Sequence, residues 1–159
     1  MIRTYIFDTS SFNKMKHYYP AIFETVWSHL DYLVNNGLLI STKEVWTEIN
    51  NGSPTPHLIE WLNDRKNQIF TTPTKDELLF VSEIFKVKHF QTLIGNTQKL
   101  RGTPVADPFL IACAKIHGGI LITEEAFKPN SSKIPNVCEH FDVEYMNFEE
   151  LMLEQKWKF

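Results

Sequence analysis

Short apolar runs alternate with longer amphipathic stretches along this chain. The clearest run is Ile120-Leu121-Ile122, which follows two glycines and consists only of branched aliphatic side chains, as is typical of a strand buried on both faces of a parallel sheet. Further runs of this kind lie at residues 4–7, 38–40 and 143–146, and a shorter one lies at 69–70. The pattern therefore predicts five strands, with 120–122 in the centre of the sheet.

Between these runs, apolar residues recur at the three- and four-residue spacing of amphipathic helices. Pro20 precedes the longest such stretch and Gly37 follows it, while Asn147 with Glu150 forms a predicted capping box. The segment 86–102 mixes basic and apolar residues and predicts a helix followed by a loop. Other helices are expected after Asp8, at 43–49, after Pro56, after Thr74 and at 108–114.

Strands that alternate with helices predict an α/β fold with a central, mostly parallel sheet and helices on both faces. The length of 159 residues suits one domain, and no repeat or linker divides the sequence. We therefore expect a single three-layer α/β/α domain over residues 1–159. In sheets of this kind, ligands bind beyond the carboxyl ends of the strands.

Composition narrows the class of protein only slightly. With 43% hydrophobic residues the chain can bury a core, so disorder is not expected. The net charge of −3 counts against a simple nucleic-acid-binding module, but not against a nuclease whose carboxylates hold metal ions. Cys113 and Cys138 have no paired metal spacing, and Cys113, which lies in an apolar run, is expected to be a buried free thiol. Without a signal peptide or an apolar run of roughly 18 residues, the sequence predicts a cytoplasmic protein that does not enter membranes.

Acidic residues follow the predicted strands or begin the predicted helices at four places. Asp8 follows the first strand, and Asp107 begins the apolar helix at 108–114, where the helix dipole favours a carboxylate. Carboxylates gathered at one edge of a sheet repel one another, and Mg²⁺ or Mn²⁺, which prefer oxygen ligands, relieve that repulsion. Two such ions activate water and stabilise the departing oxygen of a phosphodiester. The other two places hold pairs: Glu44 with Glu48 on one helix face, and Glu124 with Glu125 after the strand at 120–122.

Each acid taken alone also has a structural explanation. Asp8 is a suitable helix cap, and Asp107 could cap a helix that starts with Pro108. The two glutamate pairs could be solvated surface charges, which is the common fate of such pairs. The joint placement of all four at strand ends and helix starts favours a shared site over these separate explanations.

Four segments resemble, in order and spacing, the motifs of PIN domains, in particular those of VapC-like ribonucleases. In that family a strand ends in Asp followed by Thr or Ser, a helical Glu follows, a second Asp precedes an apolar helix, and a later strand runs into an acid. The segment from Lys133 to Cys138 resembles a PIN-like subfamily catalogued as domain of unknown function 4411. Together the four motif-like segments span nearly the whole chain: Ile6 to Ser10, Val45 to Ile49, Ala106 to Ala112 and Leu121 to Glu125.

The resemblance implies which carboxylates are catalytic and bind one or two Mg²⁺ or Mn²⁺ ions: Asp8, Glu48, Asp107 and Glu125. Glu125 stands where the family usually has Asp, a difference that bears on metal geometry and ion preference. The motif spacing favours Glu48 over Glu44 and Glu125 over Glu124, and both alternatives stay open. Residues expected to support the ligands by hydrogen bonds, with helix capping as the alternative role for the first two, are Thr9, Ser10 and Thr123.

The resemblance also implies a metal-dependent endoribonuclease, in bacteria often the toxin of a toxin–antitoxin pair. Such toxins act on RNA, are silenced by an antitoxin protein and are often homodimers. RNA must approach an acidic pocket, so basic residues are expected to flank it, and Phe90 among them is a candidate for base stacking. The alternative for this basic stretch is a solvated helix face. The basic residues concerned are Lys14, Lys88, Lys99 and Arg101.

Other classes of function compete with the nuclease. A catalytically silent PIN-like module that binds RNA or protein would keep the fold, and Glu in place of Asp at position 125 is compatible with it. A phosphatase of the haloacid-dehalogenase kind needs a second Asp where this chain has Ser10. A phospho-receiver needs Asp where Ser41 follows the strand at 38–40. The nuclease is therefore the favoured prediction.

Overall fold

A computed structural model shows the chain as an α/β fold and describes residues 2–93 and 105–159. Its strands are β1 (Tyr5–Phe7), β2 (Leu39–Thr42), β3 (Phe70–Thr71), β4 (Ile120–Ile122) and β5 (Tyr145–Met146). They form one sheet in the order β3-β2-β1-β4-β5, and each neighbouring pair runs parallel. The predicted α/β class with a central parallel sheet is confirmed.

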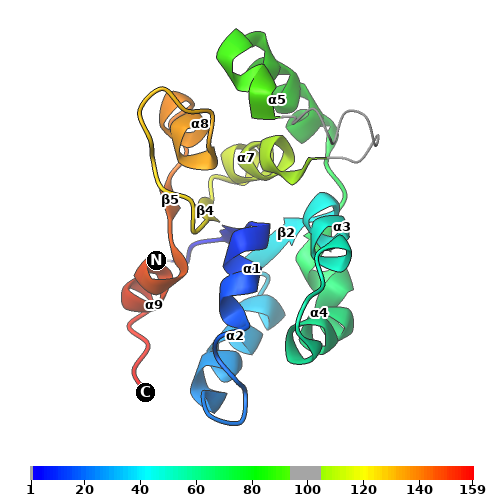
Figure 1. Ribbon diagram of the computed structural model, residues 1–159, viewed down its shortest axis with the longest axis vertical. Coiled ribbons are helices and arrows are strands. Elements are labelled where there is room, and N and C mark those ends of the chain that lie inside the picture. Colours follow the sequence, from blue (N-terminus) through cyan, green and yellow to red (C-terminus); the bar gives the residue numbers. More distant parts are fainter. Residues whose placement is uncertain (1, 94–104) are drawn as a thin grey trace.

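Helices cover both faces of this sheet (Figure 1). Within the described ranges they are α1 (Thr9–Met15), α2 (Glu24–Asn35), α3 (Lys43–Asn51), α4 (Pro56–Ile69), α5 (Lys75–Lys86), the 3-10 helix η1 (Lys88–Leu93), α7 (Ala106–His117), α8 (Ile134–His140) and α9 (Phe148–Glu154). On one face α7 packs across β1, β2 and β4, with α5 and α8 against it, and on the other α2 and α4 pack against β2. None of these described helices has the length and hydropathy needed to cross a membrane.

The two central strands are buried on both sides. Every residue of β1 and β4 is at most 2% exposed. Phe7 of β1 packs its ring against Phe12 of α1 and Phe148 of α9, with centroid distances of 5.2 and 6.1 Å. This double coverage is why the sequence of both strands is an uninterrupted apolar run rather than an alternation of apolar and polar residues.

The structure differs from the expected elements at three places. The long helix after Pro20 begins only at Glu24, because residues 19–22 form a turn in which the backbone N–H groups of Ile22 and Phe23 donate to the carbonyl of Tyr19. Helix α8 occupies residues for which no helix or strand was predicted. In the basic segment 86–102, Lys86 is the last residue of α5 and η1 spans Lys88–Leu93. Residues 94–102 lie outside the described part of the chain.

Hydroxyl groups tie the strands together at their carboxyl ends. Ser41 Oγ donates to the carbonyl of Phe7 at 2.6 Å, and Ser11 Oγ donates to the carbonyl of Ile122 at 2.7 Å. The backbone N–H of Asp8 donates to the same Ile122 carbonyl at 3.0 Å. Because Phe7 pairs with Ile122 in the register of β1 and β4, the residues that follow both strands emerge side by side.

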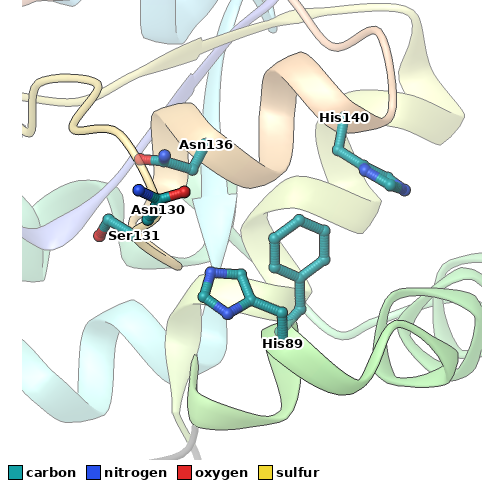
Figure 2. Close-up of a pocket in the computed structure, with 6 residues that line it drawn as sticks. His89, Asn130, Ser131, Asn136 and His140 are labelled. Carbon is teal, nitrogen blue, oxygen red and sulfur yellow. The ribbon is translucent and has the colours of Figure 1, made fainter.

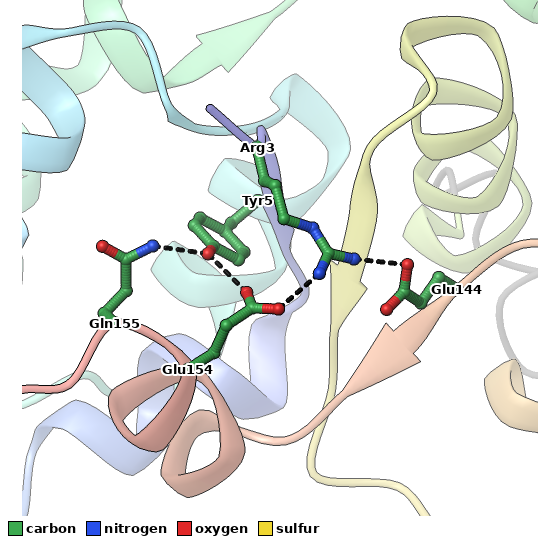
Figure 3. Close-up of polar contacts among 5 residues, drawn as sticks. All are labelled: Arg3, Tyr5, Glu144, Glu154 and Gln155. Carbon is green, nitrogen blue, oxygen red and sulfur yellow. Dashed lines mark hydrogen bonds and ion pairs between the residues drawn. The ribbon is translucent and has the colours of Figure 1, made fainter. Parts of the chain in front are cut away.

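The opposite edge of the sheet is held by a polar network (Figure 3). Arg3 forms ion pairs with Glu144 before β5 and with Glu154 at the end of α9. Tyr5 Oη donates to Glu154 Oε2 at 2.6 Å and accepts from Gln155 Nε2 at 2.6 Å. Burial and the hydrogen bond to Glu154 raise the pKa of Tyr5 to about 12. This network fastens the C-terminal helix to the first strand.

Candidate active site

Asp8 sits at the carboxyl end of β1 and caps α1. Its carboxylate accepts hydrogen bonds from the backbone N–H of Ser11 at 2.8 Å, from Ser10 Oγ at 2.7 Å and from Thr123 Oγ1 at 2.6 Å. The residue is 3% exposed. Burial raises its pKa, and the three sets of hydrogen bonds offset part of that rise. Capping and a place in the site are therefore compatible roles for Asp8.

Glu48 connects α3 to the starts of α1 and α7. Its Oε2 accepts from Thr9 Oγ1 at 2.5 Å, and its Oε1 accepts from the backbone N–H of Ala106 at 3.1 Å. Ala106 is the first residue of α7 and directly precedes Asp107. Thr9 thus forms a hydrogen bond with Glu48, and the contact with Ala106 holds Glu48 next to the second aspartate.

Asp107 lies in the first turn of α7, and its carboxyl group is surrounded by acids. Burial raises its pKa to about 8, helped by the negative charges of Glu125, Glu48 and Asp8. These are the four acids that the motif spacing selects. None of the four forms an ion pair with a basic side chain in the described ranges. Among the described residues, the carboxyl edge of the sheet therefore carries concentrated negative charge that no ion pair balances.

The adjacent acids after β4 turn in different directions. Glu124 Oε1 accepts from the backbone N–H of Phe148 at 3.0 Å, at the start of α9. Glu125 Oε2 accepts from the backbone N–H of Ile134 at 2.9 Å, at the start of α8. Both carboxylates meet helix N-termini, where negative charge is favourable, but only Glu125 contributes to the raised pKa of Asp107.

Glu44 is not a solvated surface charge, contrary to one explanation of the pair on α3. It is 4% exposed, and its Oε2 has no hydrogen-bond partner in the described structure. Its charge is not among the causes of the raised pKa of Asp107, whereas that of Glu48 is. Glu48 is thus the member of this pair that lies with the other acids.

The donor set of the four acids suits a hard divalent cation. It consists of oxygen alone, which Mg²⁺ and Mn²⁺ prefer, and Asp107 receives no hydrogen bond from the rest of the described chain. In the described ranges, the one group of three or more candidate ligand atoms within 4.8 Å of one another is Glu77, Cys113 and His117. The four acids therefore stand further apart than the ligands of a single bound ion, as unscreened carboxylates do.

Comparison with known proteins identifies the family. The profile described as Domain of unknown function (DUF4411) matches residues 5–159. The chain belongs to the DUF4411 family. No curated protein matches this DUF4411 sequence.

Among solved structures, 11 chains match this DUF4411 fold. One of them comes from a crystal structure of VapBC2 from Rickettsia felis, bound to a DNA fragment from the VapBC2 promoter. It has a TM-score of 0.52 and 11% sequence identity, over 91% of this chain and 98% of that one. A likeness at this identity concerns the fold, and it agrees with the PIN-like α/β architecture expected from the sequence.

Basic and polar side chains flank the acids of this DUF4411 protein. A hollow of about 310 Å³ next to the site is lined by Ser10, Asn13, Lys14, Lys16, His17 and Glu124. Lys14 therefore shares this hollow with Ser10, which donates to Asp8, and Lys88 is exposed on η1. Lys99 and Arg101 lie outside the described residues. Phe90 is 5% exposed and packs edge-on against His140, so its ring is a core element rather than an open stacking surface.

A second hollow, of about 430 Å³, opens beside α8 (Figure 2). Figure 2 shows Asn130, Ser131 and Asn136 grouped on one side, with His89 facing them. Asn136 holds the loop in place, since its Nδ2 donates to the carbonyl of Lys128 at 2.6 Å. Asn136 lies in the segment that resembles the subfamily, but nothing in the sequence indicated that it would lie together with Asn130 and Ser131, because these residues come from a loop and a short helix that carry no periodic signal.

Proposed function

We propose that this protein is a cytoplasmic, metal-dependent endoribonuclease that hydrolyses RNA phosphodiester bonds. Asp8, Glu48, Asp107 and Glu125 bind one or two Mg²⁺ or Mn²⁺ ions. The observation that carries the proposal is the state of Asp107, whose pKa is raised to about 8 by burial and by the three other acids. Four acids from four segments of the chain, with no ion pair to a basic side chain in residues 2–93 and 105–159, are a poor arrangement for stability alone and a suitable one for divalent cations.

Hydroxyl groups near the acids form hydrogen bonds with two of the proposed ligands. Ser10 and Thr123 donate to Asp8, and Thr9 donates to Glu48. Such hydrogen bonds fix the direction of a ligand and hold it in its charged form. When bound, divalent ions supply a nucleophilic water at neutral pH and neutralise charge on the phosphate. Lys14, next to Ser10 in the neighbouring hollow, is placed to attract the phosphate backbone of the substrate.

A partner protein is the second part of the proposal. The solved neighbour is a chain of VapBC2, bound to promoter DNA, and a similar arrangement here would pair this chain with an antitoxin that covers the acids. We also propose that the nuclease forms a homodimer in this arrangement. Co-purification of the chain with the product of a neighbouring gene, together with loss of cleavage in the complex, supports this part.

Cleavage of a mixed tRNA and rRNA pool by the purified protein tests the activity. Cuts should appear with Mg²⁺ or Mn²⁺, disappear with EDTA, and be absent in Asp8→Asn and Asp107→Asn. Glu124→Gln is the matched control, because its carboxylate faces α9, and it should cleave at the parent rate. Cuts that persist in the folded aspartate variants would show that these carboxylates are not the active site.

A catalytically silent module that binds RNA or protein is the second candidate. The observation that favours it is Glu125, which replaces the usual Asp and already has one oxygen bound to the N–H of Ile134. Such a module binds RNA without cutting it. Equal RNA binding by the parent and by Asp107→Asn, with no cleavage by either in Mn²⁺, would select this candidate.

A further inference from the structure

A separate group of metal-ligating side chains lies where α5 packs along α7 (Figure 1). Glu77 comes from the first turn of α5. Cys113 and His117 are four residues apart in α7, so they share one face of that helix. One carboxylate oxygen, one sulfur and one imidazole nitrogen of this group all lie within 4.8 Å of one another. His117 is ten residues beyond Asp107, roughly 15 Å along the helix axis, so the group is distinct from the four acids.

One of the three separations between the ligand atoms is close to that in a tetrahedral metal site, and the other two are at most 4.8 Å. His117 Nε2 and Glu77 Oε1 are 3.2 Å apart. Zinc bonds of about 2.1 Å to nitrogen and oxygen and about 2.3 Å to sulfur put tetrahedral ligand atoms roughly 3.4–3.6 Å apart. The nitrogen and oxygen therefore need almost no movement, and the sulfur needs a shift of about 1 Å or less.

Burial leaves the charge of Glu77 in need of a positive partner. Glu77 is 1% exposed and has no Lys or Arg partner among the described ion pairs. Its Oε2 accepts from the backbone N–H of Thr74 in the capping box, so the carboxylate is held in place from one side. The side chain of His117 is 43% exposed and leaves a path from solvent. Among the described ion pairs, only His117 faces Glu77, and the buried sulfur of Cys113 lies beside both side chains.

We propose that Glu77, Cys113 and His117 form a binding site for a zinc-type ion. A thiolate and an imidazole favour Zn²⁺ over Mg²⁺, whereas the oxygen-only acids at the sheet edge favour Mg²⁺ or Mn²⁺. Three protein ligands leave a fourth position for water. The ion joins the first turn of α5 to the last turn of α7. This site does not depend on the proposed nuclease activity.

Ligation exchanges a proton for the metal ion. Burial, and to a lesser degree the charge of Glu77, raises the pKa of the Cys113 thiol to about 12, so the thiol keeps its proton when no ion is bound. The S–H bond breaks as the sulfur–zinc bond forms, and the proton goes to solvent. No oxidation or reduction takes place. Binding therefore weakens as pH falls.

Cobalt titration of the full chain tests the site, because a sulfur ligand gives Co²⁺ a charge-transfer band in the near ultraviolet that oxygen ligands do not give. The parent, Asp107→Asn and Cys138→Ser should all show the band, since Cys138 is the other buried cysteine and lies outside the group. Cys113→Ser should lose the band. His117→Ala, a substitution at an exposed position that leaves the core intact, should weaken binding by at least tenfold. Added Zn²⁺ should displace Co²⁺ and remove the band.

Thermal unfolding gives the second readout. Free Zn²⁺ at a hundredfold excess over the Kd of the parent should raise the parent Tm by about 5–10 °C and that of His117→Ala, whose binding is at least tenfold weaker, by no more than about half as much. The proposal is overturned if the parent gives no sulfur-to-cobalt band, if the band survives in Cys113→Ser, or if Cys138→Ser removes it. Loss of RNA cleavage in the aspartate variants has no bearing on these outcomes, so the two proposals fail independently.

Discussion

Asp8 and Asp107 both lie among the acids at the carboxyl ends of the strands, but they differ in the hydrogen bonds that their carboxyl groups accept. Asp8 accepts hydrogen bonds from Ser10, Ser11 and Thr123, which favour its charged form. Asp107 accepts none from the described part of the chain and is surrounded by three like charges. Of the two, Asp107 is therefore the one whose ionisation a cation bound at the proposed site would favour most.

Asp107→Asn should stabilise the metal-free protein at neutral and alkaline pH. The pKa of Asp107 is about 8 in the folded state against an ordinary value of 3.8, so the folded state keeps a proton that the unfolded state has lost. Stability of the parent therefore falls as pH rises between those values. Asn removes this loss. Because water still reaches the group, we expect a gain of about 2 kcal/mol near pH 8, roughly 4–8 °C in Tm.

Thermal unfolding in EDTA at about pH 4 and about pH 8 measures this effect, and the gain should vanish at the lower pH. Added Mg²⁺ or Mn²⁺ should then raise the Tm of the parent and leave that of the variant unchanged. A variant less stable than the parent at the higher pH would show that Asp107 is not destabilised by its neighbours.

Thr123→Val should weaken Asp8 as a ligand while keeping the shape of the core. Thr123 is 1% exposed, and its hydroxyl donates to Asp8 at 2.6 Å. Loss of a buried hydrogen bond to a charged group lowers stability by about 1.5–3 kcal/mol. It also raises the pKa of Asp8 further, so the acid limb of the cleavage profile should move to higher pH. Thr47→Val, at an exposed position of α3, is the control and should leave the profile unchanged.

The order of elements in the sequence could predict that acids lie near one another, but not how two adjacent acids differ in their contacts. Acids that follow strands of a parallel sheet meet at one edge, so the proximity of Asp8 to the acids after β4 follows from the order of elements. The different roles of Glu124 and Glu125 depend on where α8 and α9 begin. The group around Cys113 was missed because its third member, Glu77, comes from another helix and shows no spacing in the sequence.

At the scale of elements, two helix N-termini determine the directions of the acids after β4. The backbone N–H at the start of α9 binds Glu124, and the corresponding group of α8 binds Glu125. Both interactions combine a hydrogen bond with the favourable end of a helix dipole. One loop thus anchors two short helices and delivers one carboxylate to the site.

Glu124→Gln and Glu125→Gln should separate anchoring from catalysis. Each substitution removes a charge from a helix N-terminus, which lowers stability by about 0.3–1 kcal/mol. Only Glu125→Gln removes a proposed metal ligand, and metal stabilisation of the transition state is worth several kcal/mol, so its cleavage rate should fall by about a hundredfold or more. Rates measured per folded protein at saturating Mn²⁺ give the comparison. Equal losses in both variants would contradict the assignment of Glu125.

Among the helices, a capped helix with a solvent-facing side was predictable, and a short helix whose first turns are buried was not. The capping box of α9, with Asn147 and Glu150, is present as expected. Helix α8 was not predicted, because its first five residues, 134–138, are all buried and a helix buried all round lacks the polar face that gives a periodic pattern. The start of α2 was placed too early because Pro20 is followed by a turn before the helix begins.

At the scale of the whole molecule, different interactions lie at the carboxyl ends and at the amino ends of the strands. The carboxyl edge gathers like charges that oppose folding. At the amino edge, opposite charges and hydrogen bonds link Arg3, Tyr5 and Glu154 (Figure 3). This network attaches α9 to β1 at the end of the sheet opposite the four acids.

Tyr5→Phe should lower stability and leave the activity of the folded protein intact. It removes a hydroxyl that donates to Glu154 and accepts from Gln155, and a buried hydrogen bond to a charged acceptor contributes about 1.5–3 kcal/mol. The pKa of Tyr5 is raised from 10.0 to about 12, so this contribution is complete below about pH 10 and is lost as pH rises toward 12. Urea unfolding at about pH 8 and about pH 11 should therefore show a large difference between parent and variant at the lower pH and a smaller one at the higher.

Glu154→Gln separates the two interactions at this edge. Gln at position 154 still offers Tyr5 an acceptor but loses the ion pair with Arg3, so its stability should become less sensitive to salt, since screening weakens partly exposed pairs. Metal-dependent cleavage should stay at the parent rate in both variants, because neither residue contacts the four acids. If Tyr5→Phe remains folded yet loses cleavage, the amino edge also controls the geometry of the carboxyl edge, and the two edges cannot be treated as independent.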